Sequence, residues 1–245
     1  MNLAAVETAT ETVGVAVRTD AGVEADLALT GRRRHVESLT PALEHLLHQV
    51  GLRPRNLEAI AVDIGPGLFT GLRVGVAAAK ALAQALGVGL VTASSLEILL
   101  AAAAAAGHHG PVCAAVDARR GELFAVVRDV DTGGPGAASD LIAPALLAPD
   151  ALAAALYGLA PAERGVLAVG DGAQRYVHVL EAVPGVEVVA PALSYPPPST
   201  LLTMARTRLD AGEASVPAAA VVPLYMREAD ATSNFAQADR AGRDG

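Results

Sequence analysis

The chain has 245 residues, 52% of them hydrophobic and 3% aromatic, and its formal net charge at pH 7 is -8. This length and apolar content suffice for one large domain or two small lobes with a packed core. An acidic chain lacks the clustered Lys and Arg that grip a phosphate backbone, so any nucleic-acid contact is expected to depend on a partner.

Cysteine content and hydropathy predict a cytoplasmic protein. The single cysteine, Cys113, cannot form an internal disulfide, which fits a reducing compartment. The N-terminal apolar run has no basic leader and is interrupted by Glu7, so we expect no signal peptide. The most apolar region, residues 81–106, is divided by Gln, Gly, Ser and Glu, which favours helix, buried strand and helix over a membrane span.

Three short Val- and Leu-rich segments open the chain, at residues 3–7, 13–18 and 23–29. Thr-rich and Asp-Ala-Gly turns separate them, which predicts successive antiparallel strands. A helix is predicted next, because Leu and Val recur at helical spacing from Leu39 to Val50. Pro41 fits the first turn of this helix, and Gly51 can end it.

A strand, a glycine-rich loop and a helix are predicted between residues 59 and 86. The strand covers 59–63, the loop reads Gly-Pro-Gly-Leu-Phe-Thr-Gly at 65–71, and the helix runs from about 71 to 86 with Gly87 as its cap. A strand at 90–93 follows, and Ser94 or Ser95 caps an Ala-rich helix that ends near residue 107. We expect these elements to complete a first lobe, residues 1–107.

The same order of elements recurs, less completely, after residue 108. A hairpin of strands at 112–116 and 123–127 precedes a Gly- and Ala-rich linker at 132–139, a short helix after Asp150, a strand at 166–169 and a helix at 199–209. This recurrence predicts two related α/β lobes, the second one reduced and covering residues 108–227. The polar tail at 228–245 is expected to be flexible.

Glu7, Thr8 and Thr10 form the first candidate site. The acid ends a strand and the hydroxyls crowd a tight turn, an arrangement that could hold a metal–phosphate group. A Thr-rich hairpin turn without a ligand explains the same residues, and local sequence favours it.

The glycine-rich block also has two interpretations. Backbone amides at 65–71 could bind an anion, with Thr70 capping the helix, or the glycines could allow close helix-to-strand packing; no P-loop ending closes the block. Gly71, Gly75 and Ala79 recur at four-residue steps, which leaves a groove for a partner helix or for the protein's own sheet. Arg73 opposes the helix dipole, so it either meets an acidic residue of a partner or extends into solvent.

The remaining polar groups predict no catalytic centre. The run Arg-Arg-Arg-His at 32–35 could meet phosphate, but we interpret it as a solvated loop. His45 and His48 are three residues apart on an exposed helix face, so we predict no metal site. No nucleophile elbow occurs, and Cys113 lies in a predicted strand.

Four motifs, taken in order, resemble one family. They are Leu-Ala-Ala-Val-Glu-Thr-Ala-Thr at 3–10, His-Val-Glu-Ser-Leu-Thr-Pro at 35–41, Gly-Pro-Gly-Leu-Phe-Thr-Gly-Leu-Arg-Val-Gly at 65–75 and Val-Asp-Ala-Arg-Arg-Gly-Glu-Leu-Phe at 116–124. The family is TsaB, the dimerization subunit of bacterial tRNA threonylcarbamoyladenosine synthesis. The resemblance is specific over residues 1–130 and continues in Val-Gly-Asp-Gly at 169–172 and Pro-Leu-Tyr-Met-Arg at 223–227. It implies the actin-like ATPase (ribonuclease H-like) fold, with two lobes of mixed sheets flanked by helices.

The resemblance also implies a nucleotide site that this chain has largely lost. Glu7 stands where the family usually has Asp, Asp117 is followed by Ala and two Arg in place of a phosphate turn, and residues 170–172 keep part of a paired-glycine element. The positions implied for this vestigial site are Glu7, Thr8, Thr10, Asp117, Gly170 and Gly172. We expect no bound cofactor.

The catalytic paralogue of the family is similar to this chain but carries two metal-binding histidines four residues apart. Ser95 and Leu99 stand at those places, and neither side chain can replace an imidazole on a transition metal. The resemblance therefore implies a non-catalytic subunit that pairs, through helices at 35–50 and 71–86, with the catalytic threonylcarbamoyltransferase paralogue, or with itself when that protein is missing. The implied interface residues are His35, Leu39, Leu43, Gly67, Thr70, Gly71, Arg73, Gly75, Ala78, Ala79 and Leu82.

Further partners follow from the same resemblance. A small ATPase subunit of the same complex is expected, tRNA is expected to bind only indirectly, and no membrane contact is expected. Gly75→Leu is expected to break pairing while leaving the monomer folded. Two other functions stay open: a small ATP-dependent phosphotransferase that uses Glu7 and Asp117 around Mg-ATP, and a peptidase, for which the sequence offers neither a nucleophile nor a zinc-binding set.

Overall fold

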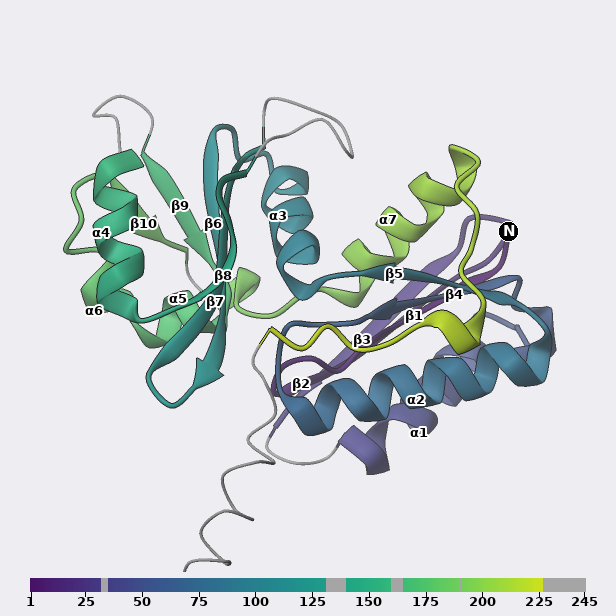
Figure 1. Ribbon diagram of the computed structural model, residues 1–245. Helices are drawn as coiled ribbons and strands as arrows, with labels where there is room; N and C mark the ends of the chain where they lie inside the picture. Colours follow the sequence, from purple (N-terminus) through teal and green to yellow (C-terminus); the bar gives the residue numbers. More distant parts are fainter. Residues whose placement is uncertain (32–34, 131–139, 160–164, 190, 227–245) are drawn as a thin grey trace, which may run out of the picture.

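The computed structural model describes residues 1–31, 35–130, 140–159, 165–189 and 191–226, which form two five-stranded sheets with helices around them (Figure 1). The strands are β1 (Leu3–Glu7), β2 (Thr12–Arg18), β3 (Glu24–Thr30), β4 (Ala59–Asp63), β5 (Gly89–Ala93), β6 (Pro111–Arg119), β7 (Glu122–Asp129), β8 (Asp140–Leu147), β9 (Val166–Val169) and β10 (Val186–Val188). The helices are α1 (His35–Gln49), α2 (Phe69–Leu86), α3 (Ser95–Ala105), α4 (Pro149–Leu159), α5 (Asp171–Arg175), α6 (Val177–Leu180) and α7 (Pro198–Asp210), with 3-10 turns η1 (Pro54–Asn56), η2 (Pro191–Leu193) and η3 (Ala218–Ala220). The arginines at 32–34, the linker at 132–139 and the tail at 228–245 lie outside the described residues.

The first sheet has the strand order β3-β2-β1-β4-β5. β1, β2 and β3 pair antiparallel, as the predicted meander requires, whereas β1, β4 and β5 run parallel. Every residue of β1 and β4 is buried, because helices cover both faces of the sheet. This burial explains why the two strands read as continuous apolar runs that end in an acid.

The second sheet repeats this topology. Its order, read from the other edge, is β8-β7-β6-β9-β10, with β6, β7 and β8 antiparallel and β6, β9 and β10 parallel. β6 therefore occupies the place of β1, and β9 the place of β4. The second lobe is reduced as predicted, since β10 has only 3 residues and α5 and α6 have 5 and 4, against 18 in α2.

α1 and α2 lie side by side on one face of the first sheet (Figure 1). Two predicted details of these helices are wrong. α1 begins at His35, so Pro41 lies inside the helix and not in its first turn. α2 begins at Phe69 with Leu68 at the N-cap, so Thr70 lies within the first turn and does not cap the helix. Gly87, with φ 70°, ends α2 as predicted.

The last helix of each repeat crosses to the other sheet. α3 follows the first sheet, but its Leu99 and Ala103 pack with Val112 of the second sheet. α7 follows the second sheet, but its Leu201 packs with Ala5 of the first. Ala-rich positions on this face of the first sheet leave room for a closely packed helix.

The C-terminal segment also returns to the first sheet. Leu90 and Val216 exchange two backbone hydrogen bonds, of 2.9 and 2.7 Å, and the Leu224 amide donates to the Ile64 carbonyl at 2.7 Å. The lobe boundaries predicted at 107 and 227 stay a prediction, but α3 packs on the second sheet and α7 on the first. Continuous sequence blocks do not coincide with the packed units.

The other face of the second sheet is covered by α4, α5 and α6, whose Leu152, Ala173 and Leu180 surround the buried Cys113 and Leu123. Burial raises the pKa of the Cys113 thiol to about 12, which leaves this group inert. Within the described parts of the chain, no helix is long and apolar enough to cross a membrane.

Candidate functional site

Four acidic residues lie at the carboxyl ends of equivalent strands in the two lobes. Glu7 ends β1 and Asp117 lies near the end of β6, while Asp63 ends β4 and Asp171 follows shortly after β9. Asp63 was not among the site residues predicted from the sequence. Its signal is the one that marked Glu7, namely an acid that ends a fully apolar strand and precedes a turn.

Glu7 is completely buried. Its Oε1 atom accepts a hydrogen bond of 2.7 Å from the Ala9 amide, while Oε2 has no hydrogen-bond partner. Burial, reinforced by the nearby Asp63 carboxyl, raises the pKa of Glu7 well above its ordinary value. The hydrogen bond from Ala9 places this buried carboxyl inside the β1–β2 turn.

The Asp63 carboxyl group accepts hydrogen bonds from a backbone amide and from a hydroxyl group. Its Oδ1 accepts from the Gly65 amide at 2.7 Å, and the Ser95 hydroxyl lies 2.9 and 2.8 Å from Oδ1 and Oδ2. Burial raises the pKa of Asp63 to about 7. Leu99, one turn further along α3, is fully buried in the core with β6. Ser95 and Leu99, which stand at the two histidine places of the catalytic paralogue, are therefore both committed to internal contacts.

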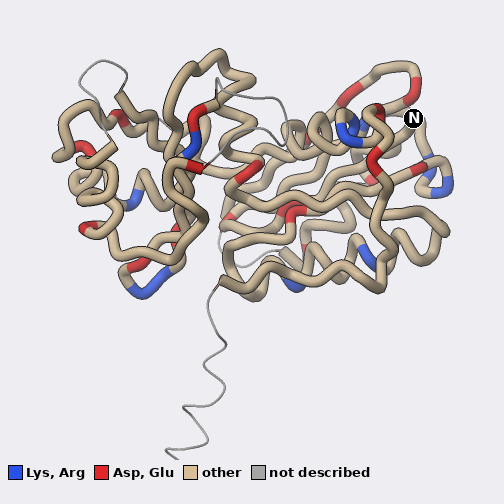
Figure 2. Tube along the Cα trace, turned by 45° about the horizontal axis from the view of Figure 1, so that its top comes forward, with Lys and Arg blue, Asp and Glu red and all other residues tan. Residues whose placement is uncertain are grey.

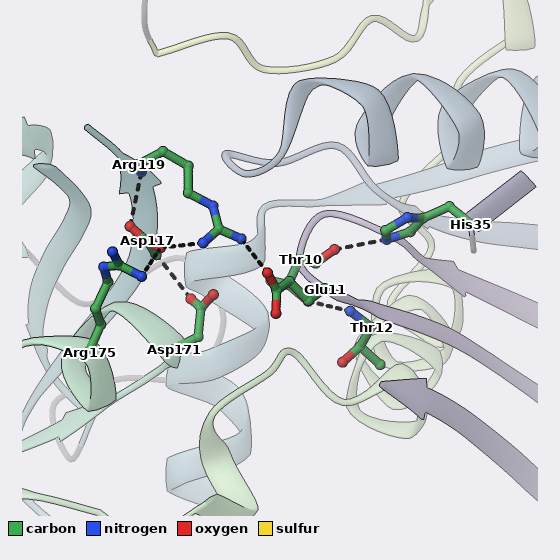
Figure 3. A network of polar contacts seen from close by, with 8 residues as sticks. All are labelled: Thr10, Glu11, Thr12, His35, Asp117, Arg119, Asp171 and Arg175. Carbon is green, nitrogen blue, oxygen red and sulfur yellow. Dashed lines mark hydrogen bonds and ion pairs between the residues drawn. The ribbon is translucent and has the colours of Figure 1, made fainter. Parts of the chain in front are cut away.

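An arginine of the second lobe bridges the two hairpin turns (Figure 3). Arg119 donates from Nη2 to Glu11 Oε1 at 2.7 Å and from Nη1 to Asp117 Oδ2 at 2.9 Å. Burial lowers the pKa of Arg119, but its hydrogen bond to Glu11 and the Asp117 charge outweigh this effect, so the pKa is raised. Glu11 belongs to the turn between β1 and β2, and Arg119 is the last residue of β6, so the contact joins the lobes.

Asp117 lies at the centre of this polar network. The Arg119 amide donates to its Oδ1 at 2.9 Å, and Arg175 Nη1 lies 3.6 Å from its Oδ2. The Asp117 amide donates to Asp171 Oδ1 at 3.0 Å, and burial raises the pKa of Asp171 to about 6. Two guanidinium groups thus neutralise the carboxylate that the resemblance assigned to a phosphate site.

The turn after Asp117 does not fit a nucleotide phosphate. Arg119 and Arg120 have φ angles of 63° and 55°, in the left-handed region where a phosphate-binding turn would place glycine. The Arg119 side chain folds back over Asp117 and is hydrogen-bonded to its carboxylate. Together with the buried Glu7, this arrangement does not fit Mg-ATP. Among the described residues, no group of three or more His, Cys, Asp or Glu could hold a metal ion.

The glycine-rich block packs against the β1–β2 turn. A Cβ atom added at Gly67, Gly71 or Gly75 would lie 2.1 Å from an atom of Ala9 or Thr8. The Thr8 hydroxyl donates to the Gly71 carbonyl at 2.9 Å. The packing interpretation of these glycines is confirmed, and the groove they form is filled by the protein itself. Thr10 takes part through its carbonyl, which accepts from His35 Nε2 at 2.8 Å.

Gly170 and Gly172 are packed in the same manner. A Cβ atom at Gly170 would lie 2.0 Å from the Ala115 carbonyl oxygen, and one at Gly172 would lie 2.8 Å from the Val116 carbonyl carbon. Close approach to β6 therefore explains both glycines. The adenosine turn that the resemblance assigned to them stays a prediction.

The eleven predicted interface residues are buried, half-buried or exposed. Leu39, Gly71, Gly75 and Ala79 are buried in the first lobe, as is His35. Leu43, Gly67, Ala78 and Leu82 are half-buried. Thr70 and Arg73 are exposed. Gly71 and Gly75 face Thr8 of the protein itself, so Gly75→Leu is now expected to disturb the monomer as well as any pairing.

Two lobes with the same strand order, closed around acidic strand ends, define the actin-like ATPase superfamily. A family model described as "TsaD: tRNA N6-adenosine threonylcarbamoyltransferase" matches residues 28–235. The chain belongs to this family, and within it to the TsaB proteins.

Three relatives illustrate the likeness. The tRNA threonylcarbamoyladenosine biosynthesis protein TsaB of Bacillus subtilis is 29% identical over 98% of this chain and 100% of its own length. The TsaB protein of Escherichia coli is 33% identical over 51% of this chain and 53% of its own length. The solved structure of YeaZ from Pseudomonas aeruginosa superposes with a TM-score of 0.76 at 28% identity and covers 91% of this chain and 99% of YeaZ.

Proposed function

We propose that this chain is a non-catalytic subunit in tRNA threonylcarbamoyladenosine biosynthesis, where it supports the catalytic threonylcarbamoyltransferase paralogue. The observation that carries the proposal is the bridge from Arg119 to Glu11 and Asp117. It fills the space between the lobes with the protein's own charges. A protein that keeps this fold while blocking the ligand site is suited to act through its surface.

The residues of this chain at the two metal-binding positions of the catalytic paralogue support the same function. Ser95 is hydrogen-bonded to Asp63 and Leu99 is buried in the core, so two imidazoles at these places would need a rearranged interior. The chain therefore contributes binding, and its partner contributes the chemistry.

The docking face proposed for the paralogue is the outer side of the α1–α2 pair (Figure 1). Val36 on α1 is 72% exposed, and Phe69 on α2 is 48% exposed. Two adjacent helices with exposed apolar residues can pack against an equivalent pair. The same face can serve a homodimer when the paralogue is missing, and a small ATPase subunit is the further partner of the complex.

We expect the complex, and not this chain alone, to bind tRNA. Basic positions are scattered over both lobes and interspersed with acidic ones (Figure 2). With a net charge of -8, such a surface attracts a phosphate backbone weakly.

Depletion of the protein followed by nucleoside analysis of total tRNA tests the proposal. Loss of threonylcarbamoyladenosine, restored by a plasmid copy of the wild-type gene, is expected. Unchanged modification after depletion would refute the role. Calorimetry of the isolated chain with Mg-ATP addresses the phosphotransferase alternative: no binding heat is expected, and saturable binding would favour that enzyme.

A further inference from the structure

Phe69, Arg73 and Tyr225 form one cluster on the surface, where α2 begins and the C-terminal segment passes. The Arg73 guanidinium carbon lies 3.8 Å from the centre of the Phe69 ring, and Arg73 Nε donates to the Tyr225 hydroxyl at 3.1 Å. The two aromatic rings are 5.4 Å apart at their centroids, with an interplanar angle of 39°. The arginine is thus stacked on one ring and hydrogen-bonded to the other.

The cluster is held in place before any partner arrives. Tyr225 follows a segment that is fixed to the first lobe, because Val221 is buried and its carbonyl accepts from Lys80 Nζ at 2.7 Å. The amide of Leu224 is bound to Ile64. Side chains fixed in this way lose little conformational freedom on binding, which favours affinity.

The cluster holds two of the three exposed aromatic side chains in the described part of the chain, the third being Tyr157 on α4. The whole sequence holds three Phe, four Tyr and no Trp. Phe69 is 48% and Tyr225 45% exposed, and they adjoin the exposed Val222 and Leu224. Aromatic residues and arginine dominate the energetic centres of protein interfaces. The chain has few aromatic residues, and two of them contact each other at this solvent-exposed cluster. The cluster therefore has the composition of a docking anchor.

Arg73 determines the kind of partner. It makes no ion pair with the described residues, and its Nε is the nitrogen that Tyr225 engages. Its terminal nitrogens can therefore bind a carboxylate in the bidentate manner of guanidinium groups. A two-fold symmetric contact centred on this cluster would bring two Arg73 cations together, so a second copy is disfavoured and an acidic partner is favoured.

We propose that this cluster anchors the catalytic paralogue, which contributes a carboxylate to Arg73 and an apolar side chain against Phe69 and Tyr225. The identity of the partner rests on the proposed function; the chemistry of the contact rests on the cluster. The anchor is thus placed at the start of α2 and on the C-terminal segment, away from the buried glycines.

Binding of the purified chain to the purified catalytic paralogue of the same organism tests this anchor, measured by calorimetry at two salt concentrations. Arg73→Met keeps the length of the side chain and removes the charge; we expect Kd to rise about 10- to 30-fold and to depend less on salt. Arg73→Lys keeps the charge but lacks the planar guanidinium group. We expect its Kd to lie between the Kd of the wild type and that of Arg73→Met. Tyr225→Phe deletes only the hydroxyl and is expected to raise Kd about 3- to 10-fold.

Arg206→Met on α7, which covers the opposite face of the first sheet, is the matched control and is expected to change Kd less than about twofold. If the wild-type chain does not bind the paralogue, the proposed function fails. If it binds and Arg73→Met binds equally well with the same salt dependence, the anchor is wrong while the function stands. Loss of affinity for tRNA in place of the paralogue would also overturn the anchor.

Discussion

Arg119 and Glu11, 108 positions apart in the sequence, meet at 2.7 Å and tie the hairpin turn of one lobe to that of the other (Figure 3). The same guanidinium holds Asp117, of which only 4% is exposed. The arginine therefore does two things at once: it closes the space between the lobes and neutralises a buried carboxylate.

Removing this arginine is expected to destabilise the protein more than removing its partner. Arg119→Ala leaves the buried Asp117 with the backbone amide of residue 119 and, as its charged partner, only the longer contact to Arg175, and should lower the free energy of unfolding by about 1–3 kcal/mol. Glu11→Gln breaks a partly exposed ion pair and should cost less than about 1 kcal/mol. Urea denaturation measures both values. Arg206→Ala, which breaks the surface pair with Asp210, is the control and should cost about 0.5 kcal/mol or less.

The contact of Gly75 with Thr8 predicts a paired effect. Gly75→Ala places a methyl group 2.1 Å from the Thr8 hydroxyl, so the turn must shift and stability should fall by about 1–3 kcal/mol. Thr8→Ala removes that hydroxyl, so the double variant Thr8→Ala/Gly75→Ala should be more stable than the sum of the single effects predicts. Additive effects in thermal or urea denaturation would contradict the contact.

Gly158 provides the matched control for this substitution. It lies in α4, and a Cβ atom added there meets no atom within 4 Å. Gly158→Ala should therefore raise the free energy of unfolding by about 0.5–1 kcal/mol, the usual gain of Ala over Gly in a helix. The same chemical change is thus expected to have opposite signs in α2 and α4.

Asp63 makes stability depend on pH. Its pKa rises from 3.8 to about 7 through burial, so between these values the folded state binds more protons than the unfolded state. The contribution of Asp63 to the free energy of unfolding is therefore present at low pH and is lost as pH rises toward and through 7, by at most about 1.4 kcal/mol per pH unit. Asp171, with a pKa of about 6, acts in the same direction.

Asp63→Asn isolates this effect, because asparagine keeps an acceptor for the Gly65 amide but does not titrate. Relative to the wild type, this variant should be more stable at pH 8 than at pH 5.5, as measured by urea denaturation at both values. Asp26→Asn, at an exposed position of β3, should show no such change. An equal difference between Asp63→Asn and the wild type at both pH values would contradict the assigned pKa.

Ser94 controls the start of α3. Its hydroxyl accepts from the Glu97 amide at 3.1 Å, while Glu97 Oε2 accepts from the Ser94 amide at 2.9 Å, which completes a capping box. Ser94→Ala should lower the free energy of unfolding by about 1 kcal/mol, and Ser94→Thr should restore most of it. Equal stability of all three proteins would argue against the cap.

Local patterns in the sequence predicted the elements well. Turns and apolar runs located the strands of the first sheet and β6, β7 and β9 of the second, but not β8 or β10, and Ser94 and Gly87 marked helix ends as expected. The crossing of α3 and α7 was not predictable, because an apolar helix face carries no information about which sheet it covers. For the same reason, the glycine spacing did not predict which residue the glycines contact. Gly71 and Gly75 indicate a close contact, and only the fold shows that the contact is Thr8.

The polar network was only partly foreseeable. Arg119 was expected to stand in place of a phosphate turn, because Ala and two Arg follow Asp117. Its partner Glu11 could not be identified, since the pairing depends on how the two lobes are placed. Asp63 was missed because an acid after a buried strand resembles an ordinary strand end until Ser95 and Glu7 are brought beside it.

The crossed helices make the two halves of the molecule one folding unit. A chain stopped after α3 would lack α7, leaving Ala5, Ala61 and their neighbours without cover, and α3 would have no second sheet to pack on. Neither repeat can complete its own interior, so we expect a single calorimetric unfolding transition in place of two. The mutual exchange of terminal helices thereby fixes the angle between the lobes and gives the surface cluster on α2 a rigid base.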